Sequence, residues 1–333
     1  MNFDDVFVIA EIGGNHEGNI DVARKLMHLA IDAGADSVKF QVYTGDSLVN
    51  IKEDPTRVKH FDRFALTDQD YISLAKECIE SGADFNASIW NERQINLLDP
   101  YMSFYKIGSG DLTAYPLLKC IVAKKKPIVL STGLSNFDEI RQTIKYICSL
   151  DQIYLNKSML SILQCTSMYP IPDEDANLNV IRSLQNEFPY SIGYSDHTEG
   201  VSAVHYAVAL GAKVIEVHFT DDREGKEFRD HKVSFTPDEL QSFKANTKAI
   251  VSILGDGEKR PMKSEIESGH RVSFRRALYP SRDINSGEII KESDLVALRP
   301  MHGICASKLG EIVGKKARNR ISKLSPLDSD FFE

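Results

Sequence analysis

The chain has 333 residues, of which 42% are hydrophobic and 26% are charged. This composition is ordinary for a globular protein and excludes a disordered, collagen-like or disulfide-rich chain. The length fits a (β/α)₈ barrel of about 250 residues with a remainder of roughly 80. The formal net charge is −8, and no basic run is longer than Lys124–Lys126, so we expect neither nucleic acid nor a membrane surface as a partner.

Targeting signals and cysteine spacing indicate the compartment. No apolar run approaches the roughly 18 residues of a membrane span, and the first residues, Met1–Asp5, are acidic where a signal peptide needs positive charge. The five cysteines are odd in number and show no C-x-x-C spacing. We therefore expect a cytoplasmic protein with reduced thiols, without disulfides or structural zinc.

From residue 6 to about residue 250, short β-branched or aromatic runs alternate with segments of helical period. After the first run, Val22, Leu26 and Leu29 share one face of an expected helix. Thr67 and Asp70 form a capping pattern at the start of another. The expected strands are 6–10, 37–41, 84–88, 104–107, 127–131, 160–164, 190–193 and 214–219. Eight such units without a G-x-G-x-x-G motif predict an α/β fold, a closed (β/α)₈ TIM barrel.

The pattern changes near residue 255. Leu254–Pro261 is polar and turn-rich, and the later β-type runs are short: Ala277–Tyr279, Glu288–Ile290 and Val296–Leu298. We expect a barrel domain over 1–254, a linker over 255–274 and a small β-rich domain over 275–333. The small domain holds 11 Lys and Arg against 8 Asp and Glu. A basic domain of this kind could pack over an anionic site, although chance and solubility explain the charge equally well.

Chemistry in such barrels lies at the carboxyl ends of the strands, and polar side chains end nearly every expected strand. Lys39 and Lys106, together with hydroxyl groups on neighbouring strands, predict a pocket for a small dianion such as a phosphate. The turn Gly108–Gly110 would let backbone N–H groups approach that ligand. An unpaired buried lysine is costly, so these lysines indicate function, with an ion pair to a carboxylate as the structural alternative.

Two histidines, His197 and His218, end neighbouring strands. Both could bind one divalent metal ion, with Glu11 or Glu216 close by, and imidazole with oxygen ligands suits Mn²⁺, Fe²⁺, Co²⁺ or Zn²⁺. A single histidine at a strand end is more often a hydrogen-bonded structural group. We take the remaining histidines as surface or structural residues, except His231, whose role stays open.

The segment Ala10–Gly18 resembles the opening of the sialic acid synthase family, which includes legionaminic and pseudaminic acid synthases. Arg299–Pro300 with Gly303–Ile304 resembles the antifreeze-like (SAF) domain that closes these enzymes. Further segments match the family in order: 38–41, 105–111, 130–133, 165–170, 193–198 and 216–220. The resemblance implies a transferase that condenses phosphoenolpyruvate (PEP) with an open-chain N-acylated aldose. The products would be a nine-carbon 2-keto-3-deoxy sugar acid and phosphate.

The resemblance also implies roles for single residues. The metal ion, most often Mn²⁺ with Mg²⁺ or Co²⁺ as alternatives, would be held by His197 and His218 and would polarise the aldehyde. The catalytic residues would be Glu11, Lys39, Lys106, His197 and His218. PEP would be bound by Lys39, Lys106, Ser109, Ser131, Ser167 and Ser195. The sugar would be bound by Asp111, Tyr169, Asp230 and Arg299, of which Arg299 would reach it across a homodimer with swapped C-terminal domains.

Several positions depart from the family pattern, and they cluster on the sugar side. Asp111 stands where glutamate is usual, and Ser167 stands where sialic acid synthases usually carry asparagine. Asn86–Ile89, Met301–His302 and the segment 224–232 also differ. We therefore expect an unusual acceptor sugar. Two alternatives remain: a Schiff-base aldolase with Lys106 as the nucleophile, and a non-catalytic sugar-binding relative.

Overall fold

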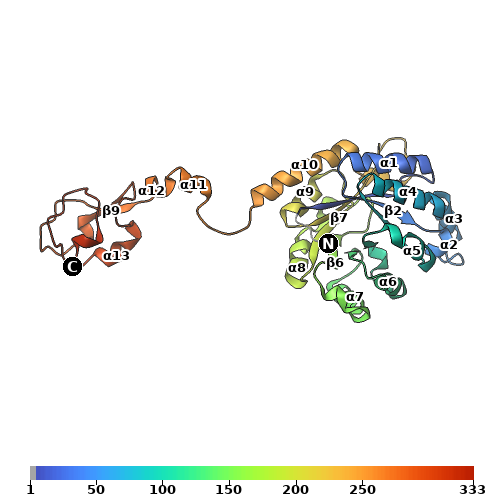
Figure 1. The fold of residues 1–333 in the computed structure, drawn as a ribbon, viewed down its shortest axis with the longest axis horizontal. Helices are drawn as coiled ribbons and strands as arrows, with labels where there is room; N and C mark the ends of the chain where they lie inside the picture. The colour runs from blue at the N-terminus through green and yellow to red at the C-terminus, as the bar shows by residue number, and fades with distance from the viewer. Residues whose placement is uncertain (1–4) are drawn as a thin grey trace. The chain divides into compact units, whose positions relative to one another are not determined.

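The computed structural model describes residues 5–333, and the chain divides into two compact units, the first ending at Gly255 and the second spanning Asp256–Glu333 (Figure 1). In the first unit eight strands form one sheet with the order β3-β2-β1-β8-β7-β6-β5-β4. All of its ladders are parallel. The strands are β1 (Phe7–Gly13), β2 (Ser37–Val42), β3 (Asp84–Ile89), β4 (Tyr105–Ile107), β5 (Ile128–Ser131), β6 (Leu160–Cys165), β7 (Ser191–Asp196) and β8 (Val214–His218). The predicted barrel is confirmed.

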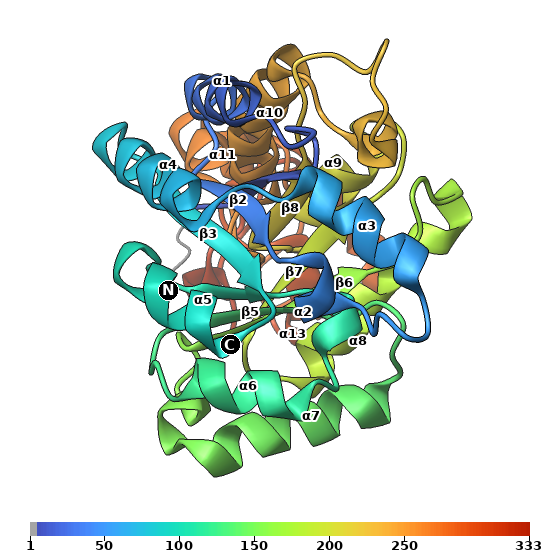
Figure 2. The ribbon, with the colours of Figure 1, turned by 90° about the vertical axis from the view of Figure 1, so that its right-hand side faces the viewer.

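Helices surround the sheet, as Figure 2 shows. They are α1 (Ile20–Asp32), α4 (Asp68–Glu80), α5 (Glu92–Leu98), α6 (Tyr115–Val122), α7 (Phe137–Leu150), α8 (Asn179–Glu187), α9 (Ser202–Ala209) and α10 (Pro237–Leu254). Two further helices, α2 (Gly45–Leu48) and α3 (Pro55–Phe64), lie between β2 and α4. The predicted cap of α4 is present: the Thr67 side chain accepts from the Asp70 N–H, and the Asp70 carboxylate accepts from the Thr67 N–H. This reciprocal pairing satisfies two N–H groups that a helix leaves free at its start.

Among the described residues no ladder joins β3 to β4. The barrel therefore closes between these two strands through individual contacts. Phe85 and Met102 form an isolated bridge, and the Asn86 Nδ2 donates to the Phe104 carbonyl oxygen at 2.7 Å. The side chain of Asn86 thus takes the place of a backbone hydrogen bond at the seam. The barrel interior contains a cluster of fully buried apolar side chains: Ile9, Phe104, Val129, Leu163 and Val214.

The second unit has its own small core, which includes Ile284, Ile290 and Ile312. It contains α11 (Lys263–Glu267), α12 (His270–Ser273) and α13 (Leu309–Ile312), and an antiparallel pair of strands, β9 (Ala277–Pro280) and β10 (Leu295–Leu298). The segment expected as a linker, 255–274, therefore holds two short helices. The expected strand over Glu288–Ile290 forms an isolated antiparallel bridge from Ile289 to Lys316, flanked by backbone hydrogen bonds from Ala317 to Glu288 and from Ile290 to Lys315.

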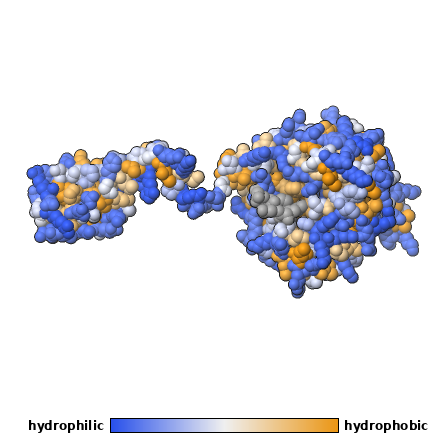
Figure 3. Space-filling view, viewed as in Figure 1, coloured by the Kyte–Doolittle hydropathy of each residue, from blue (hydrophilic) through white to orange (hydrophobic). Residues whose placement is uncertain are grey.

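Most of the face seen in Figure 3 is hydrophilic. Within residues 5–333, the helices lack the combination of length and apolar sequence that crossing a membrane requires.

Candidate active site

Strand register brings the predicted polar residues together at the carboxyl end of the barrel. Glu11 pairs in register with Lys39 on one side and with His218 on the other, and Ser195 pairs with Glu216. A cavity of about 450 Å³ opens over them. All the predicted site residues except Arg299 line it, namely Glu11, Lys39, Lys106, Ser109, Asp111, Ser131, Ser167, Tyr169, Ser195, His197, His218 and Asp230.

Four charged side chains meet at the floor of this cavity, each 5% exposed or less. Lys39 Nζ lies 2.8 Å from Glu11 Oε2 and 3.5 Å from Glu216 Oε1, and Lys106 Nζ lies 3.1 Å from Glu216 Oε2. The Ser195 hydroxyl donates to Glu216 Oε2 at 2.6 Å. Glu216 therefore joins both lysines and one serine in a single buried network.

The pKa values of the two carboxyl groups diverge. Burial alone would raise the pKa of Glu216, but Lys106 and Lys39 hold it well below its usual range, so Glu216 is ionised. Burial raises the pKa of Glu11 above its usual value, although Lys39 opposes the shift. Two carboxyl groups whose pKa values are pushed apart can divide the work of charge stabilisation and proton handling. Glu216, predicted from the sequence only as a carboxylate close to a metal ion, is the counter-ion of both lysines.

The hydroxyl groups of Ser131, Ser109 and Ser167 lie near Lys106 or Gly133 and line the same cavity. Lys106 Nζ donates to Ser131 Oγ at 2.7 Å, and the Gly133 N–H donates to Ser109 Oγ at 3.0 Å. A Cβ atom at Gly133 would overlap the hydroxyl groups of Ser109 and Ser167, so only glycine leaves this space free. Hydroxyl groups, an ammonium group and a bare backbone together form a cradle suited to a phosphate.

The two predicted metal ligands, His197 and His218, lie side by side with ring centres 5.3 Å apart. His197 Nδ1 lies 2.6 Å from the Thr166 carbonyl oxygen, which can only accept, so Nδ1 carries a proton. In the neutral form of the ring the other nitrogen then has a lone pair for a metal ion. His218 Nδ1 is buried, has no hydrogen-bond partner among the described residues, and lies 3.8 Å from Asp230 Oδ2. Burial lowers the pKa of His218 to about 4, so the imidazole is neutral.

This donor set fits a divalent ion held by two imidazoles that leave other positions open. Across the described residues, no group of three or more His, Cys, Asp or Glu side chains is arranged around a common metal position. The remaining ligands of such an ion would therefore come from substrate and water.

The side of the cavity expected to bind the sugar contains further residues that were not predicted from the sequence. The Trp90 Nε1 donates to Asp111 Oδ2 at 2.8 Å, and burial raises the pKa of Asp111. The Arg229 guanidinium lies 4.7 Å from the ring centre of Tyr169, and Arg57 of α3 lines the same cavity. Arg57 and Arg229 lie on segments outside the barrel's alternating pattern, so no periodic signal marks them. Trp90 is the only tryptophan of the chain, and this alone could have marked it in the sequence as a candidate site residue.

Arg299 belongs to the second unit and is exposed. Its guanidinium lies 5.4 Å from the ring centre of Phe274. It is the predicted site residue that does not line the barrel cavity.

Comparison with known proteins identifies the family. The NeuB family model matches residues 26–259, and the SAF domain model matches residues 275–333. The chain is 34% identical to N,N′-diacetyllegionaminic acid synthase of Legionella pneumophila, over 95% of this chain and 91% of that protein. It is also 34% identical to a pseudaminic acid synthase of Campylobacter jejuni, over 98% and 96%.

Among solved structures, the N-acetylneuraminic acid synthetase of Leptospira borgpetersenii superposes with a TM-score of 0.74 at 31% identity, covering 81% of this chain and 92% of that one. A barrel with this polar mouth, matched over most of its length by one family model and followed by a matching SAF domain, places the chain in the NeuB family.

Proposed function

We propose that the protein is a PEP-dependent synthase of nonulosonic acids, the class to which its named relatives belong. It would join C3 of PEP to the aldehyde carbon of an open-chain N-acylated amino sugar. Water would add at C2 of the PEP unit, and phosphate would leave from that carbon. The products are a nine-carbon 2-keto-3-deoxy sugar acid and inorganic phosphate.

The observation that carries this proposal is the buried network of Lys39, Glu216 and Lys106 beside the serine cradle. Lys106 already donates to Ser131 Oγ at 2.7 Å and lies 3.1 Å from Glu216, so its ammonium group is oriented before a ligand binds. Preorganised donors of this kind stabilise developing charge without reorganisation during the reaction. Ser109, Ser131, Ser167 and Ser195 would bind the phosphate and carboxylate oxygens of PEP.

On the other side of the cavity, His197 and His218 would hold a divalent ion, for which Mn²⁺ is the first choice and Mg²⁺ or Co²⁺ the alternatives. When bound, the ion would supply Lewis-acid polarisation of the aldehyde. Glu11 accepts a hydrogen bond from Gln41 Nε2 at 2.7 Å and has a raised pKa. It is therefore the residue we assign to holding and passing the proton of the attacking water.

The acceptor would be bound by Asp111, Tyr169 and Asp230. We also place the enzyme in the cytoplasm. Arg299 would complete the sugar site of the other protomer in a homodimer with swapped C-terminal domains. Arg299→Ala should raise the KM for the sugar on the order of tenfold, the cost of one charge-assisted hydrogen bond, while the KM for PEP stays within about twofold. Steady-state kinetics with each substrate varied would check this, and a larger effect on PEP would contradict the assignment.

The experiment that tests the function is a substrate panel. The protein is incubated with PEP, Mn²⁺ and a series of N-acetylhexosamines and 6-deoxy-2,4-diacetamidohexoses, with and without a 6-phosphate, and released phosphate is measured. We expect release with one acceptor class and loss of release in chelator. Folded protein that releases no phosphate with any acceptor would contradict the proposal.

The Schiff-base alternative finds no support in the geometry. Its nucleophile would be Lys106, whose Nζ is engaged by Glu216, by Ser131 and by the Ile107 carbonyl oxygen at 3.2 Å. A nucleophilic amine must be free to approach the carbonyl carbon of its substrate, whereas this nitrogen already makes three close contacts. Borohydride in the presence of a keto substrate should therefore leave the mass of the protein unchanged.

A further inference from the structure

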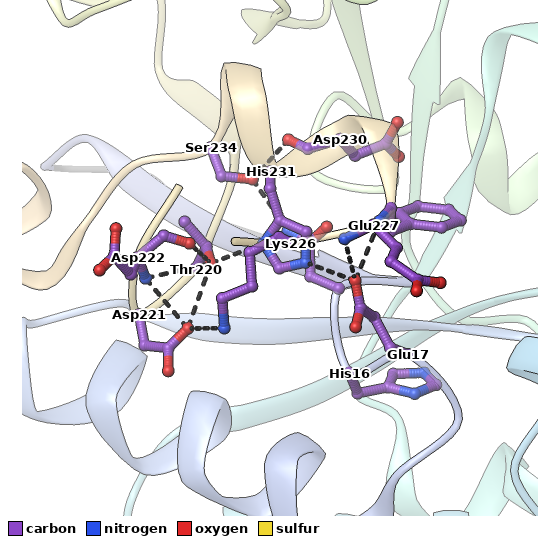
Figure 4. Close-up of polar contacts among 12 residues, drawn as sticks. His16, Glu17, Thr220, Asp221, Asp222, Lys226, Glu227, Asp230, His231 and Ser234 are labelled. Atoms are coloured by element: carbon purple, nitrogen blue, oxygen red, sulfur yellow. Dashed lines mark hydrogen bonds and ion pairs between the residues drawn. The ribbon is translucent and has the colours of Figure 1, made fainter. Parts of the chain in front are cut away.

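The segment after β8 carries Asp230 and Arg229 into the sugar side of the cavity, and it lies against the turn that follows β1. Figure 4 shows this contact. Glu17, in that turn, accepts hydrogen bonds on one oxygen, Oε1, from the N–H groups of Glu227 at 2.8 Å and Phe228 at 2.9 Å. Its carboxylate therefore holds the backbone two and three residues before Asp230.

The backbone of Glu17 is in the left-handed region, with φ of 50°. This conformation is uncommon for a residue with a side chain. From this turn the carboxylate of Glu17 contacts the segment that follows the neighbouring strand β8.

His231 lies beneath this contact and is 1% exposed. Its Nδ1 lies 2.7 Å from Thr220 Oγ1, and its Nε2 lies 3.6 Å from Glu17 Oε1. Within residues 5–333, Nε2 has no hydrogen-bond partner, and the ring lies in the electrostatic field of both Lys226 and Glu17. The ring thus spans the distance from the end of β8 to the turn after β1.

A second connection reaches the backbone of Asp230 itself. Asn15 Nδ2 donates to the Phe219 carbonyl oxygen at 2.9 Å and to Ser234 Oγ at 2.8 Å. Ser234 Oγ in turn donates to the carbonyl oxygen of Asp230 at 2.7 Å. The backbone of Asp230 is therefore held through hydrogen bonds that begin in the turn after β1.

The same turn also contacts the segment through apolar packing. A Cβ atom at Gly14 would lie 2.6 Å from the ring of Phe228, so this ring rests on bare backbone. Phe228 lines the cavity together with Arg229 and Asp230.

We propose that Glu17 and His231 are positioning residues for the acceptor sugar. They form a clasp, defined by Glu17, His231, Asn15 and Ser234, that fixes the segment 221–233 so that Asp230 faces His218. The assignment of Asp230 to the sugar rests on the proposed function. The residues of the clasp are not among those assigned to PEP, which are Lys39, Lys106 and the serine cradle. Loss of the clasp should therefore weaken binding of the acceptor and leave binding of PEP unchanged.

The test compares Glu17→Ala with Glu17→Gln. The alanine variant loses both hydrogen bonds, whereas glutamine keeps an oxygen acceptor in the same place. We expect Glu17→Ala to lower kcat/KM for the acceptor on the order of tenfold, as the loss of one or two buried hydrogen bonds does, with the KM for PEP within about twofold. Glu17→Gln should recover most of the loss. Equal effects on both substrates, or none on the acceptor, would overturn the proposal.

A matched control is Asp70→Ala, because the Asp70 carboxylate also accepts a backbone N–H, that of Thr67, at 3.0 Å. It caps a helix and lies outside the cavity lining, so both kinetic constants should stay unchanged. His231 divides the clasp further, since asparagine imitates Nδ1 and glutamine imitates Nε2. His231→Asn should retain more acceptor efficiency than His231→Gln, because the hydrogen bond of the ring is the one from Nδ1 to Thr220. The reverse order would show that the contact to Glu17 matters instead of the contact to Thr220.

Hydrogen exchange separates this proposal from the proposed function. In Glu17→Ala the amides of 221–233 should exchange at least tenfold faster than in the parent protein, whereas the amides of β1 and β2 should exchange at the parent rate. In Asp70→Ala the amides of 221–233 should also exchange at the parent rate. If no acceptor is turned over, exchange alone decides: faster exchange confined to this segment supports the clasp, and unchanged exchange refutes it. Faster exchange throughout the barrel would show a general loss of stability and would also refute it.

Discussion

Glu216 should contribute more to the stability of the folded protein when the site is empty than when an anion such as PEP is bound. The change Glu216→Gln keeps the shape of the side chain and removes its charge. Lys106 and Lys39, 3.1 Å and 3.5 Å from the carboxylate, then lose their common counter-ion at a buried position. Lys39 keeps Glu11 at 2.8 Å, while Lys106 keeps its hydrogen bonds to Ser131 Oγ and the Ile107 carbonyl oxygen.

The size of the effect follows from burial. Removing one partner of a buried ion pair costs about 3–5 kcal/mol, and the retained contacts of both lysines place this case near 3 kcal/mol. For a domain of about 250 residues, 1 kcal/mol corresponds to roughly 2–4 °C in Tm. We therefore expect a fall of about 10 °C. Because the folded-state pKa of Glu216 is below its ordinary value of 4.5, this stabilisation is present above about pH 5 and is lost as the pH falls.

The assay is thermal unfolding at pH 7 with and without PEP. PEP brings negative charge to the same lysines, so it should raise the Tm of Glu216→Gln more than that of the parent. Asp221→Asn is the matched control, since Asp221 also lies between two lysines, Lys25 at 2.8 Å and Lys226 at 2.7 Å, but is partly exposed. It should cost at most about 1 kcal/mol and leave the PEP shift unchanged. A Glu216→Gln protein that melts within one degree of the parent, with an equal PEP shift, would refute the reasoning.

Three further outcomes follow from the described geometry. Gly133→Ala, whose Cβ would overlap the hydroxyl groups of Ser109 and Ser167, should raise the KM for PEP at least tenfold in steady-state kinetics and change the KM for the sugar little; equal changes would contradict the cradle. His218→Ala should abolish turnover and weaken Mn²⁺ binding measured by calorimetry, and near-normal turnover would show that the metal assignment is wrong. Burial lowers the pKa of His16 to about 4 from an ordinary 6.5, so the unfolded chain takes up the proton first and stability should fall by on the order of 2–3 kcal/mol between pH 6.5 and 4. Urea unfolding should show a shallower pH dependence in His16→Gln, and an equal slope would exclude His16 as the cause.

Local pattern was sufficient for the barrel and for much of its mouth. Runs such as Val6–Ala10 and Ser37–Gln41 predict strands because they contain β-branched and aromatic residues and alternate with segments of helical period, and the structure has strands at both places. The polar residue that ends each run then lies at one rim, because parallel strands all end on the same side. Lys39, Lys106, His197 and His218 were found in this way from the chain alone.

Pairing across the barrel and the paths of the loops required the tertiary structure. Glu216 is the counter-ion of Lys39 and Lys106 because of strand order and register, which join residues more than a hundred positions apart. From the sequence, Asn86 was only a departure from a family motif. In the structure its side chain hydrogen-bonds the Phe104 carbonyl oxygen and helps to close the seam between β3 and β4. Glu17 and His231 meet across more than two hundred residues. Periodicity reports only which face of its own element a residue occupies, so contacts between elements, and the clasp they build, are decided when the whole chain packs.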